Sequence, residues 1–415
     1  MTGATPAPRR AQDAVDAADA PGTRAAPSRR TVLAGLAGAV AGLGAGVGAT
    51  SLGRRAPAQA PGTGPTPPDV VAAPGAVAAR GRSQAGVDRP ATPQRAGLLV
   101  VLDLDDPGDV TWLPRLGERI DVLTAAAAPR DVLPDGAGDL TVTVGLGPRV
   151  VASVDRSLPG AEDLPTFVGD DRMPAGVRGG DVVLALHASD PGALDAAARD
   201  LAPRVPGTER WRQRMFRGPG EGTIVRNPAG FHDGVVVPRT PEQLDADVWL
   251  APEDHARDLD GATIMVVRRL RMDLDGLARL PVPEQERVFG REKVTGAPLS
   301  GGGPTDEVDL RAKTPEGDLL VPARAHARAA HPSFTGSGLM LRRSYAYDDG
   351  GGEAGLVFVC FQRRLATFVA TQHRLDEVDD LMRWVRTTAS ATFLVLPGAR
   401  PGRPLGAALL GGPAR

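Results

Sequence analysis

Short apolar segments rich in β-branched residues recur along this chain, and segments with helical spacing lie between them. In the first half, residues 97–103, 139–145 and 179–187 have the length and pattern of buried strands. Residues 190–201 follow with helical spacing and an acidic residue at the start. No glycine-rich dinucleotide-binding loop follows the first strand, so this half mixes strand and helix without that nucleotide signature.

The second half repeats this arrangement with strands and helices of its own. The expected strands are residues 262–272, 339–347, 356–361 and 392–396, and the expected helices are residues 283–291 and 375–385. Two halves of this kind predict an α+β fold made of two related sandwich-like domains, residues 94–225 and 226–400. A chain of 415 residues is long enough for both domains and a substantial core.

The first 60 residues have the pattern of an export signal. Arg29 and Arg30 stand just before an uncharged stretch, residues 34–53, and a twin arginine there addresses a protein to the twin-arginine (Tat) export machinery. The stretch is mostly Gly and Ala, so it suits an export signal better than a transmembrane helix. Residues 58–60 resemble a cleavage site, although Pro61 disfavours a cut there, and a retained anchor stays open. We expect an extracellular or cell-envelope protein.

The segments that flank the predicted domains contain little that could form a core. Residues 61–93 are rich in Pro, Ala, Gly and Arg and contain almost no large apolar side chain. Such a segment cannot bury enough apolar surface to offset the entropy of ordering it. We therefore expect a disordered linker at residues 61–93 and a disordered tail at residues 401–415.

Charge and cysteine content exclude several classes of function. The formal net charge is −2, so no global positive field favours nucleic acid as a partner. Cys360 is the only cysteine, which excludes an intrachain disulfide and a cysteine-based metal cluster. It lies in an apolar run, so a role as a small core side chain is favoured over a reactive thiol.

Three short motifs, far apart in the sequence, carry the residue types of a redox metal site. They are Gly-Phe-His-Asp-Gly with Asp233, Ala-His-Ala-Arg with His326, and Leu-Arg-Arg-Ser-Tyr with Arg342. Each motif alone is a weak signal; Asp and Gly, for example, are ordinary turn residues. Together, a carboxylate, a histidine and an arginine are the groups needed to hold a haem iron and to cleave a peroxide on it.

In these and other motifs the chain resembles the dye-decolourising (DyP-type) haem peroxidase family, specifically its Tat-exported, deferrochelatase-like branch. The likeness extends from about residue 97 to residue 398. The matching segments are Leu-Thr-Val-Thr-Val-Gly-Leu-Gly-Pro (140–148), Leu-Pro-Thr-Phe-Val-Gly-Asp (164–170), Arg-Asn-Pro-Ala-Gly-Phe-His-Asp-Gly (226–234), Gly-Arg-Glu-Lys-Val-Thr-Gly-Ala-Pro-Leu (290–299) and Ser-Ala-Thr-Phe (390–393). The resemblance implies two ferredoxin-like domains, each an antiparallel sheet with packed helices, and one haem b in the second domain.

The resemblance also implies a role for each motif residue. Asp233 matches the distal acid, Arg342 the distal arginine, and His326 the proximal ligand of the haem iron. Further haem contacts fall just after the distal acid and just after the proximal histidine, on Gly234, Val235, Val236, His331, Pro332 and Ser333.

Two neighbours of these residues have roles that follow from general chemistry. A proximal histidine usually gives its other ring nitrogen to an acceptor, and Asp379, in the expected helix 375–385, is the candidate acceptor. A solvated helix carboxylate is the alternative for Asp379. Arg343 is expected to point away from Arg342, because side chains alternate along a strand, into a structural or propionate-pairing role.

Three positions depart from the family pattern. Val235 stands where Thr is usual and is followed by Val-Val-Pro, His331 stands where Asn is common, and Ser344 stands where Gly or Asn is common. These changes leave Asp233, Arg342 and His326 in place but alter the hydrogen bonding expected in the peroxide pocket.

The sequence favours an exported haem b peroxidase that uses hydrogen peroxide to oxidise one-electron donors. Tyr345, Tyr347 and Trp384 are the few aromatic side chains that could pass oxidising equivalents to a bulky donor, with core packing as the alternative. A second reading is an iron-supply or haem-handling protein of an iron uptake system. A third is a haem carrier that needs His326 but neither Asp233 nor Arg342. Homo-oligomers, and partners from iron uptake or copper oxidase systems, stay open.

Overall fold

The structure is a computed structural model that describes residues 75–255 and 257–411. The predicted export signal, residues 1–60, and residues 61–74 of the predicted linker lie outside the described residues. The described residues belong to one compact unit. No helix in this part of the chain is long and apolar enough to cross a membrane.

The first half is a four-stranded antiparallel sheet with helices packed against it. Its strands lie in the order β4-β1-β3-β2, and the long pairings join β1 to β3 and β4, and β2 to β3. The elements are β1 (Ala96–Leu104), α1 (Leu113–Thr124), β2 (Thr141–Leu146), α2 (Pro148–Val154), β3 (Val182–Ala188), α3 (Pro191–Leu201) and β4 (Gly207–Phe216). Asp190 caps α3, since its carboxylate accepts a hydrogen bond from the Gly192 N–H.

The second half has the same strand order, with β12 next to β8, β8 next to β11, and β11 next to β9 and β10. Its main elements are β8 (Thr263–Met272), α5 (Leu274–Ala278), α6 (Val282–Phe289), α7 (His326–Ala329), β9 (Leu341–Arg342), β10 (Tyr345–Asp348), β11 (Ala354–Gln362), α8 (Leu365–Val378) and β12 (Val385–Val395). The predicted strand 339–347 is divided in two, but both parts keep one register against β11. Each half therefore has the ferredoxin-like order.

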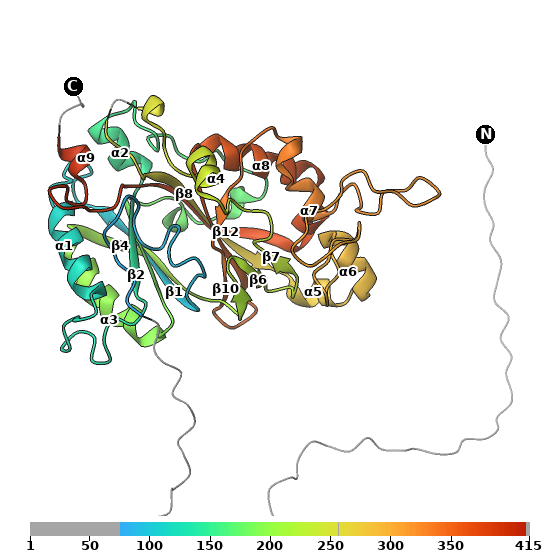
Figure 1. Cartoon of the computed structure of the whole chain (residues 1–415), viewed down its shortest axis with the longest axis horizontal. Coiled ribbons are helices and arrows are strands. Elements are labelled where there is room, and N and C mark those ends of the chain that lie inside the picture. Colours follow the sequence, from blue (N-terminus) through green and yellow to red (C-terminus); the bar gives the residue numbers. More distant parts are fainter. Residues whose placement is uncertain (1–74, 256, 412–415) are drawn as a thin grey trace, which may run out of the picture. The chain divides into compact units, whose positions relative to one another are not determined.

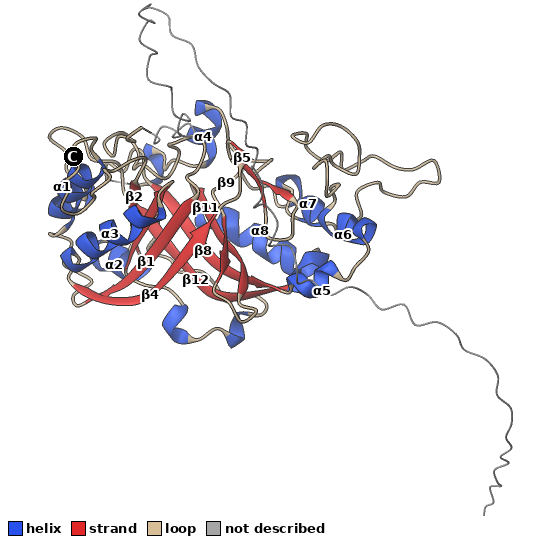
Figure 2. Ribbon diagram, turned by 90° about the horizontal axis from the view of Figure 1, so that it is seen from below, coloured by secondary structure: helices blue, strands red, loops and turns tan. Residues whose placement is uncertain are grey.

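The two halves join edge to edge. β2 pairs with β12, and β4 pairs with β10, which also pairs with β11, so the sheet closes on itself. Figure 2 shows the strands in the middle of the body, and in Figure 1 α1 to α3 and α5 to α8 lie at opposite sides of them. The predicted α+β fold with two ferredoxin-like halves is confirmed. The halves are not separate sandwiches, because pairing of their edge strands satisfies backbone groups that separate sheets would expose.

Shorter elements complete the second half around this sheet. A three-stranded sheet of β5 (Gly220–Glu221), β6 (Ile224–Arg226) and β7 (His232–Asp233) connects the halves. Helix α4 (Pro241–Asp247) follows it and begins with a capping box formed by Thr240 and Gln243. The fold thus carries the Gly-Phe-His-Asp-Gly motif on a short strand outside the main sheet.

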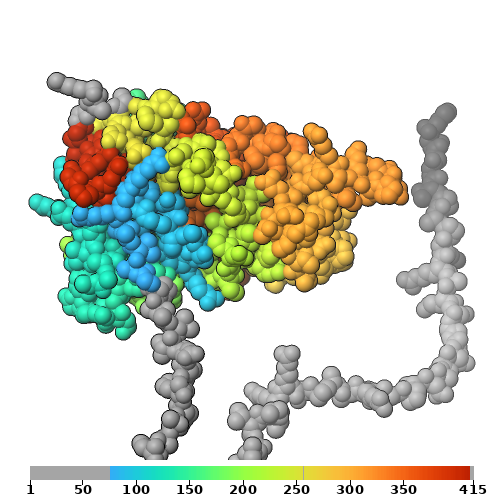
Figure 3. All heavy atoms as spheres, viewed as in Figure 1, coloured from blue at the N-terminus to red at the C-terminus, as the bar shows by residue number. Residues whose placement is uncertain are grey.

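The end of the predicted linker is ordered, which corrects that expectation for residues 75–93. Val87 is fully buried among the side chains inside the closed sheet. The Gln84 side chain donates to the carbonyls of Val144 (2.8 Å) and Leu396 (3.0 Å) and accepts from the Val144 N–H (2.8 Å). In Figure 3 this segment lies across the surface of the body in blue. Its order comes from hydrogen bonds to the sheet rather than from large apolar side chains.

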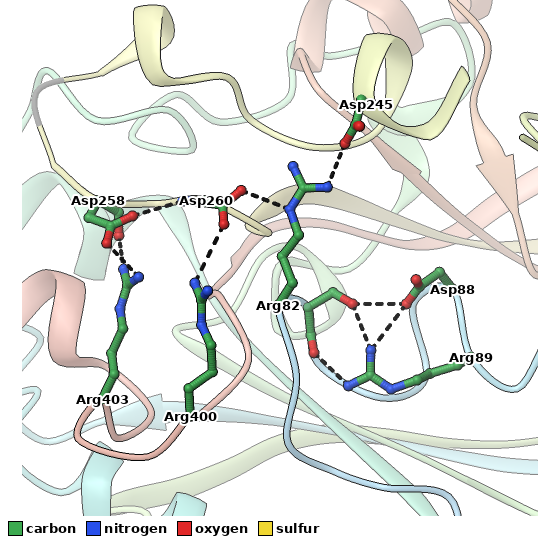
Figure 4. Close-up of polar contacts among 9 residues, drawn as sticks. Arg82, Asp88, Arg89, Asp245, Asp258, Asp260, Arg400 and Arg403 are labelled. Carbon is green, nitrogen blue, oxygen red and sulfur yellow. Dashed lines mark hydrogen bonds and ion pairs between the residues drawn. The ribbon is translucent and has the colours of Figure 1, made fainter. Parts of the chain in front are cut away.

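Ion pairs hold this segment and the chain after β12 in place. Arg82 contacts Asp245 (2.5 Å) and Asp260 (2.7 Å), and Arg400 approaches Asp260 at 3.5 Å. Figure 4 shows that these groups converge from four stretches of chain, with Arg403 on Asp258 beside them. All are partly exposed, so each pair contributes at most about 1 kcal/mol, and they act mainly by fixing geometry.

Residues 401–411 also differ from the predicted disordered tail. They include α9 (Ala407–Leu410), and Leu405 and Leu409 are buried in the core of the first half. Burying these two side chains offsets the cost of ordering a short segment. Residues 412–415 lie outside the described residues.

The predicted helix 375–385 is wrong in its boundaries. Helix α8 ends at Val378, and residues 380–384 form a short 3-10 helix. Asp379 between them has extended backbone angles, and its side chain accepts from the Leu381 N–H at 2.9 Å. Because an aspartate side chain that caps the following turn competes with helix continuation, the helix stops here.

Candidate functional site

One large cavity opens in the second half, lined by residues of the sheet and of helices α6, α7 and α8. It encloses about 1600 Å³ when the space open to solvent at its mouth is included. Strands β7, β8, β9 and β11 and helices α6, α7 and α8 all contribute residues to its lining, which makes it the candidate ligand site of this half. Its walls are largely apolar, with Phe289, Met340, Leu356, Phe358 and Leu381 among the residues that form them.

His326 lies on one wall of this cavity, at the first residue of α7. Its Nδ1 is 2.6 Å from Oδ2 of Asp379. The Asp379 side chain is fully buried, whereas 38% of the His326 side chain is accessible from the cavity. The structure thus brings together the two residues that the sequence paired as ligand and acceptor.

The contact with Asp379 also sets the charge preference of the imidazole. Burial by itself would lower the pKa of His326, but the charge and hydrogen bond of Asp379, with the more distant Asp233, raise it above the ordinary value. A hydrogen bond at Nδ1 leaves Nε2 as the ring nitrogen that can face a ligand. Among the described residues no hydrogen bond reaches Nε2, so this histidine fits an iron ligand.

Asp233 and Arg342 lie together on another part of the cavity wall, on β7 and β9. The Arg342 Nη2 is 3.3 Å from Oδ1 of Asp233, and its Nη1 donates to the Val236 carbonyl at 2.9 Å. The Gly234 N–H donates to the same Asp233 oxygen at 2.6 Å. The guanidinium is therefore anchored on the loop that follows the carboxylate.

These contacts keep the Asp233 carboxylate ionised. Burial alone would raise the pKa of Asp233, but the Arg342 charge and the Gly234 N–H lower it below the ordinary value. An ionised carboxylate in the cavity wall is able to accept a proton from a group bound there. Asp233 and Arg342 are thus arranged for proton transfer.

The other sequence-predicted contacts divide into two groups. Gly234, Val235, Val236, His331 and Pro332 line the cavity. Ser333 does not, because it lies on a 3-10 turn where its hydroxyl contacts Nδ1 of His331 at 2.8 Å. Arg343 points away from Arg342, as alternation predicted, and donates to the Pro90 carbonyl at 2.8 Å. Arg343 is absent from the cavity lining, so its position favours the structural role over propionate pairing.

Arg291 is a cavity residue that the sequence reasoning did not single out. Its side chain is almost fully buried and donates to the carbonyls of Gly296 (2.9 Å) and Asp306 (2.7 Å). No carboxylate among the described residues lies within ion-pair distance of it. Burial lowers the pKa of Arg291, which is the cost of a buried cation without a partner. The Gly-Arg-Glu-Lys segment in the quoted motifs carried the signal that could have revealed it.

Aromatic side chains pack behind His326. The rings of Phe231 and Phe289 stack with centroids 3.9 Å apart, and Phe289 meets the His326 ring edge-on at 6.4 Å. Phe231 belongs to the same motif as Asp233. This packing therefore links the distal motif to the helix that carries His326.

Comparisons with known proteins agree with this geometry. Residues 225–400 match the family model described as Dyp-type peroxidase, C-terminal. The chain is 37% identical to a dye-decolorizing peroxidase of Thermobifida fusca over 310 residues, which is 70% of this chain and 71% of that protein. It is 32% identical to a deferrochelatase of Yersinia pestis over 363 residues, 77% of this chain and 81% of that protein.

Solved structures give the same result. Ferric DtpA from Streptomyces lividans superposes with a TM-score of 0.76 at 31% identity and covers 84% of this chain and all of that one. A DyP-type peroxidase from Cellulomonas bogoriensis superposes with a TM-score of 0.73 at 33% identity, covering 82% of this chain and 99% of that one. With the family model, the relatives and the cavity in agreement, this chain belongs to the DyP-type peroxidases, a family of haem-dependent enzymes that use hydrogen peroxide to oxidise an electron donor.

Proposed function

We propose that this chain is an exported haem b peroxidase, with His326 as the proximal iron ligand and Asp233 and Arg342 as the distal pair. The observation that carries the proposal is the presence, in one apolar cavity, of an imidazole tied to a buried carboxylate and of a carboxylate tied to a guanidinium. When bound, haem supplies the iron on which peroxide is reduced and donors are oxidised.

The residues that hold haem b follow from the cavity lining. His326 would hold the iron through Nε2, while Asp379 keeps the proton on Nδ1 and strengthens the imidazole as a donor. Arg291 is a buried guanidinium that matches a propionate carboxylate, since pairing with it would compensate its charge. Gly234, Val235, Val236, His331 and Pro332 line the cavity and would help to enclose the group.

Asp233 and Arg342 act on the proton and charge of the peroxide. The ionised Asp233 carboxylate accepts a proton from hydrogen peroxide and returns it to the departing oxygen. Arg342 carries a fixed positive charge toward the oxygen on which negative charge develops. Val235 and Ser344 differ from the residues usual in the family and change the hydrogen bonds nearby. Asp233 and Arg342 nevertheless remain in contact.

Donors too bulky for the cavity require a relay to the surface. Tyr345 and Tyr347 are almost fully buried inside the closed sheet, next to the cations of Arg217 and Arg269, which disfavour loss of an electron from the rings. Trp384 is half-buried, beside Leu381 and Val385 of the cavity wall. We assign the relay to Trp384.

The sequence features of residues 1–60 support Tat export to the extracellular space or the cell envelope. The test is fractionation of cells that express the full chain and a variant with both Arg29 and Arg30 changed to Lys. Loss of the exported form in the double variant is expected. Equal export of the two chains would refute the Tat assignment.

The peroxidase proposal is tested on the haem-loaded chain by its absorption spectrum before and after one equivalent of hydrogen peroxide. Asp233→Ala and Arg342→Leu should retain the Soret band and slow its change with peroxide by about 10²–10⁴-fold, whereas His326→Ala should weaken or abolish haem binding. Wild-type rates in both distal variants would favour a haem carrier instead.

An iron-supply role in an iron uptake system is the second candidate, and identity to a deferrochelatase over 77% of this chain favours it. Its test is to incubate the haem-loaded chain without peroxide and to follow the fluorescence of metal-free porphyrin. Porphyrin release that His326→Ala abolishes would support this role. If the haem stays intact and the chain consumes peroxide rapidly, the result would support the peroxidase function and not the iron-supply role.

A further inference from the structure

A second, smaller pocket shares part of its wall with the main cavity. Asp233, Asn227 and Leu356 line both, and the remaining walls of this side pocket come from the region where β4 and β10 meet. It measures about 260 Å³ with its open mouth included, which is far smaller than the main cavity and too small for haem. No role described above uses it.

The side pocket has an excess of positive charge. Arg217 lines it and is only 7% exposed, yet its guanidinium has no carboxylate within ion-pair distance among the described residues. Its one hydrogen bond runs from Nη2 to the Thr223 carbonyl at 3.0 Å. Arg226, also in the lining, donates to the carbonyls of Gly230, Lys293 and Val294. Neither cation is compensated by a carboxylate of its own.

The carboxylate in the lining of this pocket is Asp233, and its charge is already engaged. Oδ1 of Asp233 accepts from Gly234 and lies 3.3 Å from Arg342 on the main cavity. Arg226 is exposed to solvent, so Arg217 is the buried cation of this pocket, and it has no carboxylate of its own. A buried cation without a counter-charge is costly, so an anion that enters here is stabilised.

The uncharged polar groups of the pocket are also better donors than acceptors. Oδ1 of Asn227 already accepts from the N–H groups of Ala229 (3.0 Å) and Phe231 (3.1 Å), which leaves its NH₂ group as a donor. Oγ of Ser344 accepts a hydrogen bond from the Val359 N–H at 3.4 Å, so the Ser344 hydroxyl can still donate its own proton to a ligand. A small anion needs hydrogen-bond donors, and Arg217, Asn227 and Ser344 supply them.

We propose that the side pocket binds one small inorganic anion, of the size of a halide or nitrate, held by Arg217 with Ser344 and Asn227 next to Asp233. The site is separate from the haem cavity and does not depend on the roles given to His326 or Asp379. It would place a negative charge at the wall that the two pockets share.

The test is the line width of the chloride NMR signal in the presence of the haem-loaded full chain, because a bound halide in exchange broadens it. Wild type should broaden the signal, nitrate should reverse the broadening, and Arg217→Gln should abolish it. Arg217→Lys keeps the charge and should retain binding. Arg214→Gln removes an exposed arginine of β4, three residues before Arg217 and 59% accessible, and should behave as wild type.

Two further readouts make the result decisive. The Soret band, recorded at the same chloride concentrations, should not shift; a shift together with broadening that survives Arg217→Gln would place the anion on the iron and overturn the proposal. If the wild-type protein does not broaden the chloride signal, the pocket binds no halide and the proposal is also overturned. If Arg217→Gln fails to fold, anomalous diffraction from wild-type crystals in bromide decides, since a pocket without a bromide peak at the Arg217 guanidinium contradicts the assignment.

Discussion

Nδ1 of His326 lies 2.6 Å from a carboxylate oxygen of Asp379, although the two residues are separated by 53 positions. Asp379 is the residue that directly follows the end of α8, and His326 is the residue at which α7 begins. The contact exists because two helix termini meet behind the cavity. A carboxylate held by the following turn, through the Leu381 N–H, cannot easily turn away from the imidazole.

Removing the Asp379 charge should weaken the histidine as an iron ligand. We expect Asp379→Asn to lower haem affinity or peroxidase activity by roughly 10–100-fold and to raise the iron reduction potential, since a weaker donor stabilises ferric iron less. Haem titration and spectroelectrochemistry measure the two effects. The control is Asp380→Asn, a neighbouring partly exposed carboxylate paired with Arg324. Equal potentials in wild type and Asp379→Asn would contradict the role.

Gly234 cannot carry a side chain in its present backbone conformation. Its φ is +77°, and a Cβ there would lie 2.2 Å from the Thr223 carbonyl oxygen. We expect Gly234→Ala to lower the free energy of unfolding by about 1–3 kcal/mol and to displace Asp233. Gly317→Ala is the matched control, with φ +97° but no atom within 4 Å. Chemical denaturation compares them, and equal losses would show that the contact with Thr223 does not matter.

The buried pair of Arg268 and Asp170 joins the first half of the chain to the floor of the cavity. Two hydrogen bonds of 2.8 and 3.0 Å connect them, and both residues are 2% exposed. Asp170→Ala should cost about 3–5 kcal/mol of unfolding free energy, because it leaves a buried cation uncompensated. Replacing both residues, with Asp170→Leu and Arg268→Met, should cost much less. A double variant as unstable as Asp170→Ala would exclude the charge as the cause.

Asp254 gives stability that depends on pH. Its contact with Arg363 at 2.6 Å, helped by Arg364, lowers the pKa of Asp254 to about 2. A carboxylate with a lowered folded-state pKa stabilises the fold above its unfolded pKa of about 4, and this contribution disappears as pH falls through 2. We expect Asp254→Asn to lower the free energy of unfolding by about 1 kcal/mol at neutral pH, because solvent screens this pair. Near pH 2 the substitution should not change the free energy of unfolding. Denaturation curves across this range test it, and a difference that does not depend on pH would contradict it.

Local patterns in the sequence predicted most of the regular structure. Residues 97–103 became β1, and residues 190–201 became α3, each within a residue or two at either end. These segments succeed because burial on a sheet or helix face produces a periodic pattern that no distant contact has to supply. The three short motifs likewise predicted Asp233, His326 and Arg342 as site residues. Their resemblance to the family predicted haem as the cofactor.

Contacts between distant segments decided the rest. Residues 75–93 lack large apolar side chains, and they are ordered because Gln84 completes the hydrogen bonds of β2 and of the chain after β12, which exist only in the folded sheet. Arg291 looks like any other arginine until burial removes its solvent and leaves it without a carboxylate. The sequence therefore determined the elements and the chemical groups of the site. The tertiary structure alone determined which groups became buried and paired, because burial and pairing depend on residues that the chain brings together from far apart.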